Sequence, residues 1–397
     1  MTSLSAVPTR DRFADVLAQI ADGAVDRELG NINPFDQVRL AAQAGYGRLR
    51  LPAELGGANL SLRDLFSAVI DLAEADPTVA HIYRTHFWLT EEFRNLGTPN
   101  AQRFLQLIAD GKVFGNATSE RGPKPAGDFE FTTTLTPDGD HYRLNGEKFY
   151  TTGTLFSDYV SVWTAKGTTL TSIVIPTDRT GVDILDDWDG FGQRRTGSGT
   201  TRFTDVVVTD DDILRVLPLD ETPPQSTQGS FVQLYLHAII AGILRSVVTD
   251  ATALVEGRAR NFSHATSPRP VDDPSLQQVV GELASLAYVT EAAVLYAAET
   301  LDAATESAVD GVQAPALAQA AALATSKVKV VVDEIGTRAA TLLFEAGGAS
   351  ASSRDKDLDR HWRNIRTITL HNPARLKAQA IGANLLTGQQ LPANGYF

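Results

Sequence analysis

The spacing of apolar residues changes twice along this chain, and this double change limits its possible folds more than any other feature. In residues 1–112, and again after residue 217, apolar side chains recur every three or four positions, which is typical of amphipathic helices. Between these regions lie short runs in which polar and apolar residues alternate, as in residues 202–208. We therefore expect helices, then a β-domain, then a helical bundle.

The boundaries between the three regions carry local signals. Strand-like runs begin at Phe114, and the Pro-, Thr- and Gln-rich residues 218–228 follow the alternating region. Asp273-Pro274 then provides an N-cap and a first-turn proline for a long helix. A chain of 397 residues suits two or three packed units. We predict an α+β protein with an N-terminal helical domain at residues 1–112, a central β-barrel-like domain at 113–216 and a C-terminal helical bundle at 217–397.

Two local patterns give more detailed expectations. Residues 81–96 have helical periodicity and are expected to form one continuous helix. Asn145-Gly146 follows the alternating residues 141–144 and is expected to form a hairpin turn, because both central positions of that turn favour positive φ.

The composition excludes several classes of site and partner. The chain has no cysteine, which excludes disulfides, thiolate metal sites and thiol nucleophiles, and its histidines lack metal-like spacing. A net charge of −13 disfavours nucleic acid and anionic membranes as partners. No contiguous apolar run approaches the roughly 20 residues of a membrane span, and the N-terminus lacks the pattern of a secretory signal. We expect a cytoplasmic protein without a metal, membrane or nucleic-acid partner.

Four segments carry a resemblance to a known family. They are residues 113–120 (VFGNATSE), residues 144–153 (LNGEKFYTTG), residues 192–201 (GQRRTGSGTT), and residues 344–373, which end in Leu370-His371-Asn372-Pro373. In this order, and with this layout of helices and strands, they resemble the acyl-CoA dehydrogenase superfamily over nearly the whole chain. A typical acyl-CoA dehydrogenase has Tyr-Glu-Gly-Thr near the last segment, and in many members that glutamate removes the substrate α-proton.

The Leu-His-Asn-Pro run is similar instead to the flavin-dependent monooxygenase branch, which contains dibenzothiophene monooxygenase. The resemblance implies the acyl-CoA dehydrogenase fold and an enzyme that uses reduced FMN, or alternatively FAD, together with O₂. It implies oxygen transfer through a C4a-hydroperoxyflavin to a small organic substrate, with sulfur expected before nitrogen or an activated ring. Such an intermediate has to be shielded from water and hydrogen-bonded.

The resemblance also assigns residues to the catalytic site. It implies that His86 and His371 are the active-site imidazoles, that Asn116 bonds the flavin or its peroxide, and that Thr152 lies beside flavin N5. From the residues alone, other roles stay open. His86 could be a core histidine, His371 a cap or turn residue, Thr152 an ordinary strand residue and Asn116 the cap of a turn. The two histidines are far apart in the sequence, so only the fold analogy brings them together.

Cofactor phosphate needs cationic or hydroxyl donors. The segment at residues 258–262 resembles a family segment whose arginine, here Arg260, reaches a flavin phosphate, often across a subunit interface. Arg363 is a further phosphate candidate, and Ser198, in a Gly-rich turn, is a candidate contact to the flavin or the substrate. The arginines could equally form solvated or interface ion pairs.

The expected partners follow from the same resemblance. Gly190-Phe191-Gly192 begins like a dinucleotide motif, but Arg195 occupies the third glycine position, so no nicotinamide site is expected. Reduced flavin would then come from a separate NAD(P)H:flavin reductase, and the family implies a homotetramer. Two alternatives are kept. One is an acyl-CoA dehydrogenase with a relocated base, for which Glu256 is the candidate, and the other is a flavin-binding or scaffold protein without catalysis.

Overall fold

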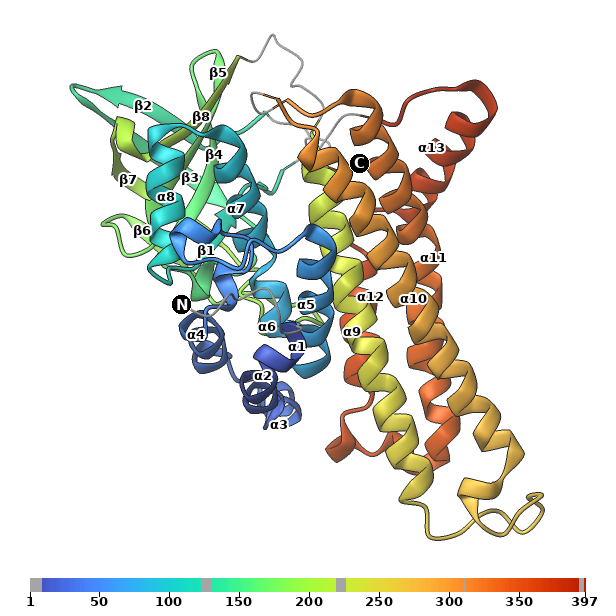
Figure 1. Cartoon of the computed structure of the whole chain (residues 1–397). Helices are drawn as coiled ribbons and strands as arrows, with labels where there is room; N and C mark the ends of the chain where they lie inside the picture. The colour runs from blue at the N-terminus through green and yellow to red at the C-terminus, as the bar shows by residue number, and fades with distance from the viewer. Residues whose placement is uncertain (1–8, 123–129, 219–225, 310–311, 393–395) are drawn as a thin grey trace.

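The structure, a computed structural model, describes residues 9–122, 130–218, 226–309, 312–392 and 396–397. Figure 1 shows a helical N-terminal part and a sheet beside a bundle of long helices. The elements change from helix to strand between Ala109 and Phe114, and from strand to helix between Pro218 and Gln228. This is the expected α+β order, and the domain boundaries at residues 112 and 216 stay predictions.

The N-terminal part consists of short helices. They are α1 (Thr9–Arg12), α2 (Ala14–Ala21), α3 (Ala24–Gly30), α4 (Phe35–Gln43), α5 (Leu62–Ala75), α6 (Pro77–Ile82), α7 (Arg84–Leu96) and α8 (Pro99–Ala109). Side chains cap several of them. Ser61 accepts from the backbone N–H of Asp64 at the start of α5, and Asp76 accepts from Thr78 and Val79 at the start of α6.

The central part is a mixed sheet. Its strands are β1 (Phe114–Ala117), β2 (Thr134–Asp138), β3 (His141–Lys148), β4 (Tyr159–Lys166), β5 (Thr169–Pro176), β6 (Val182–Ile184), β7 (Thr201–Val208) and β8 (Ile213–Pro218). The order is β6-β7-β3-β2-β4-β5-β8, and β1 pairs in parallel with β4. The long loop between β6 and β7 lies outside the ladder and supplies several side chains of the site described below.

The C-terminal part is built on long helices. They are α9 (Gln228–Glu256), α10 (Pro274–Glu306), α11 (Pro315–Gly347), α12 (Asp359–Thr369) and α13 (Ala374–Thr387). α9, α10 and α11 pack against one another along their length, and α12 and α13 pack on α11. Asp273 and Pro274 act as the predicted cap and first-turn residue of α10.

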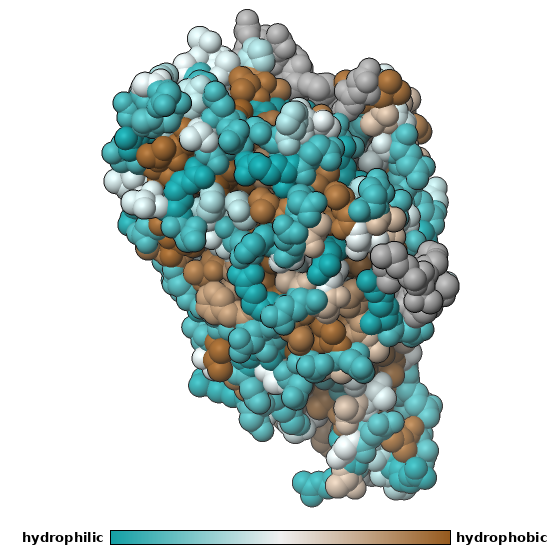
Figure 2. Space-filling model, turned by 60° about the vertical axis from the view of Figure 1, so that its left-hand side comes forward, coloured by the Kyte–Doolittle hydropathy of each residue, from teal (hydrophilic) through white to brown (hydrophobic). Residues whose placement is uncertain are grey.

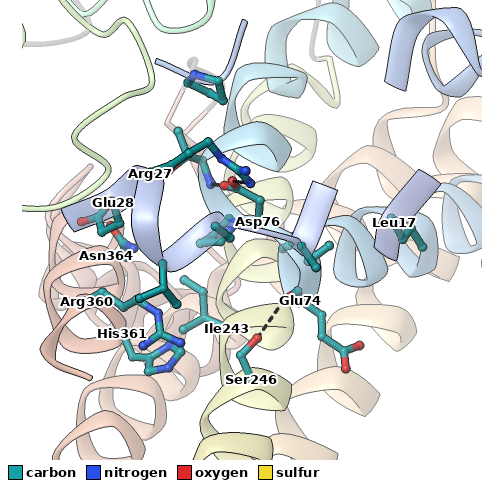
Figure 3. Close-up of a pocket in the computed structure, with 18 of the residues that line it drawn as sticks. Leu17, Arg27, Glu28, Glu74, Asp76, Ile243, Ser246, Arg360, His361 and Asn364 are labelled. Carbon is teal, nitrogen blue, oxygen red and sulfur yellow. Dashed lines mark hydrogen bonds and ion pairs between the residues drawn. The ribbon is translucent and has the colours of Figure 1, made fainter. Parts of the chain in front are cut away.

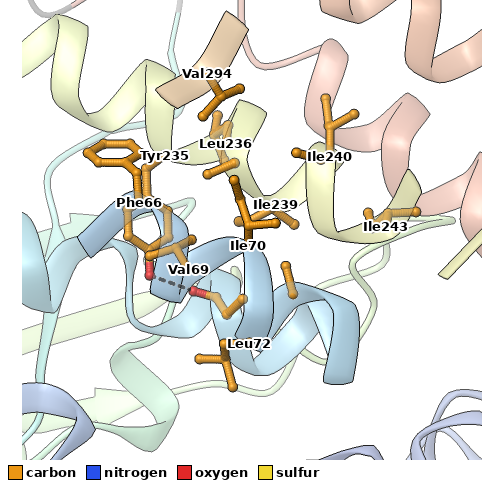
Figure 4. Close-up of a cluster of buried hydrophobic side chains, with 14 of the residues drawn as sticks. Phe66, Val69, Ile70, Leu72, Tyr235, Leu236, Ile239, Ile240, Ile243 and Val294 are labelled. Carbon is orange, nitrogen blue, oxygen red and sulfur yellow. Dashed lines mark hydrogen bonds between the residues drawn. The ribbon is translucent and has the colours of Figure 1, made fainter. Parts of the chain in front are cut away.

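The core that joins the N-terminal helices to the bundle lies between α5 and α9 (Figure 4). Phe66 and Ile70 of α5 meet Tyr235 and Ile239 of α9, and all four side chains are completely buried. Gly242 lets the two helices approach closely, because a Cβ there would lie 2.5 Å from the Ile70 carbonyl oxygen. This contact fixes α6 and α7, which follow α5, against the N-terminal half of α9.

Two local predictions were wrong. Asn145-Gly146 does not form the hairpin turn. Both residues lie inside β3, where the pairing with β7 shifts register and Thr133 leaves no room for a side chain at Gly146. The expected continuous helix at residues 81–96 is interrupted at Tyr83, which separates α6 from α7. The interruption points His81 and His86 into different surroundings.

By length and composition alone, α9 and α10 are apolar enough to cross a membrane, although neither contains a long contiguous apolar run. Both are helices of the bundle. α9 is the central core helix, and α10 carries ion-paired Glu282, Glu291 and Glu299 along its length, which lipid would not accommodate. The face in Figure 2 mixes hydrophilic and hydrophobic residues.

Candidate active site

The site begins where α6 meets the loop between β6 and β7. His81, near the end of α6, lies 2.9 Å from Gln193 through its Nδ1 and the Gln193 Oε1. Because Oε1 only accepts, the His81 ring carries its proton on Nδ1 and presents Nε2 as an acceptor. Burial and the charge of Arg84 lower the pKa of His81 to about 3, so the ring is neutral near pH 7.

A chain of hydroxyls joins this loop to the residues after β3. Thr196 Oγ1 donates to the Gln193 carbonyl at 2.9 Å, and Ser198 Oγ lies 2.7 Å from both Thr196 Oγ1 and Thr152 Oγ1. Each hydroxyl has one proton, so the chain runs from Thr152 through Ser198 and Thr196 to the carbonyl. Thr152 has therefore used its proton and presents only acceptor lone pairs. The Thr152 turn abuts α6, since a Cβ on Gly153 would lie 2.6 Å from the Ile82 carbonyl oxygen.

The second imidazole of the site is His371, which follows α12. Asn372 Nδ2 lies 3.3 Å from His371 Nδ1 and donates at 2.6 Å to Gln233 Oε1 of α9. With Nδ1 accepting, His371 presents Nε2–H as a donor. His81 and His371 therefore offer opposite functions, an acceptor nitrogen and a donor nitrogen.

His371 is an exposed residue, and three basic side chains lie close to it. Desolvation by the neighbouring protein atoms, followed by the charges of Arg84, Lys329 and Lys377, holds the pKa of His371 well below its usual range. Lys329 is paired with Asp333 at 2.8 Å, whereas burial lowers the pKa of Lys377 to about 7. The neighbourhood is locally basic on an acidic protein.

His86, the other predicted active-site imidazole, lies in the hydrophobic core. Its Nε2 donates to the Gly47 carbonyl at 2.9 Å, and its Nδ1 accepts from the backbone N–H of Phe114 at 3.3 Å. The side chain is completely buried between aromatic rings, and burial lowers its pKa to about 4. Both nitrogens are occupied by backbone, so this geometry favours the core-histidine role that the sequence left open.

Asn116 lies on β1 beside the start of α7. Its Oδ1 accepts from Thr85 Oγ1 at 2.7 Å, and its backbone carbonyl accepts from Thr154 Oγ1 at 2.9 Å. The amide Nδ2 makes no hydrogen bond to any described residue. β1 and the two loops thus bring Asn116, Thr152 and Ser198 close to α6 and α7, and their roles toward a flavin stay predictions.

The predicted phosphate ligands differ in environment. Arg363 of α12 contacts Glu28 at 2.7 Å, Asp357 at 2.6 Å and Asp359 at 2.8 Å, so its charge is already neutralised within the chain. This geometry supports the ion-pair alternative for Arg363. Arg260 is exposed after the C-terminal end of α9 and has no carboxylate partner among the residues described.

Position along α9 separates Arg260 and Glu256 from the imidazoles. Gln233 contacts Asn372 near one end of the helix, and Glu256 is its last residue. At 1.5 Å per residue, Glu256 lies about 35 Å from Gln233 along the axis. Glu256 therefore cannot act as a base next to His371, and Arg260 cannot reach a mononucleotide bound there by the same chain.

The cleft in Figure 3 is a separate feature. It encloses about 660 Å³ between the N-terminal helices and the helices α9 and α12. Its polar groups already pair with one another. Arg27 contacts Asp76 at 2.9 Å, His361 contacts Asp250 at 2.7 Å, and Ser246 donates to the Glu74 carbonyl. Paired groups of this kind hold helices together and leave few hydrogen bonds for a ligand.

The residues around His81 and His371 fit a flavin. Buried polar atoms there lack partners among the described residues, including the Gln193 Nε2 and the Asn372 Oδ1, and a flavin ring edge offers both donors and acceptors. Thr152 presents an acceptor, and reduced flavin differs from oxidised flavin in having an N–H at N5. For the phosphate, Arg258, Arg260 and Lys356 line one groove at the far end of α9.

Comparison with known proteins decides the family. The middle-domain model of acyl-CoA dehydrogenases matches residues 117–206, and the C-terminal-domain model matches residues 234–375, together more than half of the chain. The chain belongs to the acyl-CoA dehydrogenase family. Dibenzothiophene monooxygenase of Mycolicibacterium goodii is 29% identical over 366 residues, which cover 89% of this chain and 87% of that protein.

Two further relatives place the chain within this family. The probable FMNH2-dependent monooxygenase SfnC of Pseudomonas putida is 26% identical over 96% of this chain and 95% of its own length. FMN-bound TdsC from Paenibacillus sp. A11-2 superposes with a TM-score of 0.88 at 25% identity, over 98% of this chain and 99% of TdsC. The protein is a flavin-dependent monooxygenase of the acyl-CoA dehydrogenase family, as the Leu-His-Asn-Pro run predicted.

Sequence reasoning did not single out His81, Gln193 or Arg84 for this site. The signal that could have found them is the segment from His81 to His86, which places two histidines and an arginine inside an otherwise apolar helical stretch. The helix break at Tyr83 decides which histidine faces the site, and the segment contains no proline or glycine that would predict this break.

Proposed function

We propose that this protein is a two-component monooxygenase that takes reduced FMN and O₂ and oxygenates a small organic substrate at sulfur, with nitrogen as the second possibility. When bound, reduced flavin supplies two electrons and two protons. One oxygen atom of O₂ then forms an S=O bond, and the other leaves as water. The observation that carries the proposal is the pair of neutral imidazoles with opposite hydrogen-bonding capacity beside a hydroxyl chain.

The two imidazoles divide the proton chemistry between them. His371, which its lowered pKa keeps neutral near pH 7, donates a hydrogen bond from Nε2 to an oxygen that gains negative charge. His81 offers Nε2 as an acceptor and is held by Gln193. Thr152, fixed as an acceptor by Ser198, suits a donor on the reduced cofactor. The relatives named for sulfur compounds and for FMNH2 support sulfur and FMN here.

The cofactor phosphate is assigned to Arg260 of another copy of the chain. Arg260 follows the end of α9 that lies about 35 Å from Gln233, so within one chain it cannot serve the flavin beside His371. The bundle also exposes large apolar residues, namely Tyr288 and Tyr296 on α10 and Leu385 and Leu386 on α13, which a second copy could cover. A homotetramer in the cytoplasm is the assembly we propose.

The reduced flavin is proposed to come from a separate NAD(P)H:flavin reductase. The presence of glycine at positions 190 and 192 is explained by close packing. A Cβ on Gly190 would strike the Trp188 ring, and a Cβ on Gly192 would lie 2.0 Å from the Arg363 carbonyl oxygen. They allow the loop to pack closely against Trp188 and α12 and do not form a dinucleotide loop.

The proposal is tested by supplying FMN reduced by an unrelated reductase, with ¹⁸O₂, to the purified full-length chain and a panel of thioethers, thiophenes and amines. We expect one ¹⁸O atom in a sulfoxide product, measured by mass spectrometry, and no turnover with FMN that stays oxidised. Catalase in every reaction removes free peroxide, which oxidises sulfur by itself. Absence of labelled product from the whole panel, with FMN binding intact, would overturn the proposal.

A further inference from the structure

Lys329 of α11 is completely buried, and its charged end joins two helices. The Nζ atom donates to Asp333 Oδ2 at 2.8 Å, one turn further along α11, and to the backbone carbonyl of Thr369 at 3.3 Å. Thr369 is the last residue of α12, where a carbonyl has no partner within the helix. A buried ion pair stabilises a fold little more than apolar residues of the same size do. The charge of Lys329 therefore calls for a role other than stability.

The second oxygen of Asp333 extends these contacts to α9. Asp333 Oδ1 lies 3.1 Å from Nε2 of His237, which is also completely buried. One turn earlier on α9, the Gln233 carbonyl oxygen and the Gln233 Nε2 lie 2.9 and 3.4 Å from Nδ1 of the His237 ring. Both ring nitrogens of His237 are thus held, one by each helix, within the otherwise apolar contact between α9 and α11.

Gln233 connects these contacts to the residue beside His371. The Gln233 Oε1 accepts from Asn372 Nδ2 at 2.6 Å, and Asn372 directly follows His371. Thr369, which Lys329 holds, lies two residues before His371. The residues on both sides of His371 are therefore tied to one continuous set of polar contacts between α9 and α11. We call this set the polar ring, and its members are Lys329, Asp333, His237, Gln233, Asn372 and Thr369.

His371 lies where the chain passes from one helix to the next. It is an exposed residue in the short connection between Thr369, the end of α12, and Ala374, the start of α13. Asn372 Nδ2 reaches its side chain, at 3.3 Å from Nδ1. Exposed connections are mobile unless contacts restrain them. The Nε2–H of His371 therefore keeps one direction only if both flanks of the connection are fixed.

We propose that Lys329, Asp333 and His237 are positioning residues, which fix the flanks of His371 so that its Nε2–H stays directed at the oxygen that receives the hydrogen bond. This inference rests on the proposed function and adds three residues that act through His371. Lys329 anchors the end of α12, and Asn372 transmits the restraint from α9. A reacting group displaced by about 1 Å can lose a factor of about 10² in rate, so small shifts of this connection matter.

The alternative is a polar ring that only holds helices together. Such a ring affects the free energy of unfolding and every property that depends on helix packing. A positioning ring lowers kcat and leaves KM and FMN binding nearly unchanged, because the hydrogen bond from His371 acts in the transition state. Its effect also disappears when His371 is replaced, since no donor is left to position.

Two variants break the polar ring at different points. The charge-pair variant, Lys329→Met/Asp333→Asn, removes both charges together and leaves an amide oxygen for His237. The second variant, His237→Met, removes the link between α11 and α9. Each variant is also made together with His371→Gln, which gives a double-mutant cycle. Product is followed by mass spectrometry over long reactions, so the slow His371→Gln chains stay measurable.

The control is Arg179→Met/Asp212→Asn in the β-domain. Arg179 likewise donates to a buried carboxylate, that of Asp212, at 2.9 Å, and to a backbone carbonyl, that of Val207, at 3.0 Å. The control therefore loses the same kinds of contact and the same charges away from the polar ring.

Four measurements are made on the full-length chains. Reduced FMN, with the thioether of the panel above that the wild type oxidises fastest, gives kcat and KM. Flavin fluorescence gives the FMN Kd, and thermal unfolding gives the Tm. Diethyl pyrocarbonate acylates the unprotonated nitrogen of an imidazole, so its reaction with His371 reports access to Nδ1 without any turnover. Peptide mapping compares His371 with His264, an exposed histidine outside the site.

We expect both ring variants to lower kcat by about 10-fold to 100-fold, with KM and the FMN Kd within about threefold of wild type. With His371→Gln present, the same substitutions should change kcat by less than about threefold. Labelling of His371 relative to His264 should become severalfold faster, because Asn372 no longer covers Nδ1 steadily. The Tm of the charge-pair variant should stay close to that of the wild type, since both charges are removed together. The control should match the wild type in kcat and in labelling.

Three results would overturn the inference. One is a kcat within about threefold of wild type in either ring variant. The second is a loss of kcat that is as large with His371→Gln as without it. The third is labelling of His371 that is the same in the ring variants and the wild type. Failure of the proposed function looks different, because no chain would then form sulfoxide, while the labelling would still report whether the polar ring restrains His371.

Discussion

His86 and His81 lie five residues apart, and their surroundings show how this chain divides packing from chemistry. His86 has both ring nitrogens bonded to backbone groups, of Gly47 and Phe114, and no solvent contact. Across the break at Tyr83, His81 has one nitrogen fixed by Gln193 and the other open, and unpartnered atoms of Gln193, Arg84 and Asn372 share its neighbourhood. The ring nitrogens of His86 are both satisfied, whereas polar atoms around His81 are left available.

This difference has an energetic meaning. A buried donor or acceptor without a partner costs about 1–3 kcal/mol, so the unpartnered atoms around His81 lower the free energy of unfolding. Proteins retain such a cost where a ligand completes the hydrogen bonds. Substitutions in the saturated region should therefore change stability, whereas substitutions in the open region should change binding and turnover.

The largest effect is expected for His371→Gln. Removing a positioned proton donor should lower kcat by about 10²-fold to 10⁴-fold, with the free energy of unfolding nearly unchanged because His371 is an exposed residue. Sulfoxide formation and urea unfolding measure the two quantities. His141→Gln is the matched control, since His141 lies on β3 away from the site and contacts Asp138 and Asp140. Equal loss of kcat in both variants would contradict the role of His371.

The converse is expected for His86→Leu. The substitution leaves the Gly47 carbonyl and the Phe114 N–H without their partner in a dry environment, which should cost about 2–4 kcal/mol of unfolding free energy. Turnover per folded molecule should stay within a few-fold of wild type, as measured on protein quantified by its folded fraction. A His86→Leu variant that is fully stable but inactive would return His86 to the catalytic role first predicted from the sequence.

Arg260 and Arg363 extend the comparison to the phosphate site. Arg260→Ala should weaken FMN binding by tenfold or more, because a charge-assisted contact to phosphate is lost. Arg363→Ala should lower the Tm instead, since it leaves Glu28 and Asp357 without their cation, and should change the FMN Kd by less than about threefold. Fluorescence titration and thermal unfolding of both variants separate the two roles.

The smallest effect is a pH dependence of stability. Burial lowers the pKa of His86 to about 4, below its unfolded value near 6.5, so the unfolded chain binds the proton more readily. The contribution of His86 is therefore fully present above about pH 6.5 and is lost as pH falls toward 4, at up to about 1.4 kcal/mol per pH unit. The difference between wild type and His86→Leu in urea unfolding, followed from pH 7.5 to 4.5, should shrink accordingly. A constant difference would contradict a neutral, buried His86.

Much of the fold could be predicted because it follows from local patterns. Helical periodicity in residues 1–112 predicted the N-terminal helices, and the change to alternation placed the sheet. Candidates for the site came from the family resemblance, either where a residue departs from a family run, as His371 does, or where it lies in a matching segment, as Thr152 and Ser198 do. The role of His81 depends on the helix break at Tyr83, which is a property of the tertiary structure. Asn145-Gly146 misled because Thr133, which immediately precedes β2, leaves no room for a side chain at position 146.

The length of α9 has a consequence for how the enzyme could be assembled from unlike copies. One helix carries Gln233, which supports the imidazoles, and leads at its other end to Arg260, which we assign to the flavin of a second copy. A subunit lacking His371 and a subunit lacking Arg260 would each damage a different kind of site. When the two inactive variants are co-expressed, they should form mixed oligomers. Some active sites will then combine an intact His371 from one subunit with an intact Arg260 from another, so activity should return by complementation between subunits.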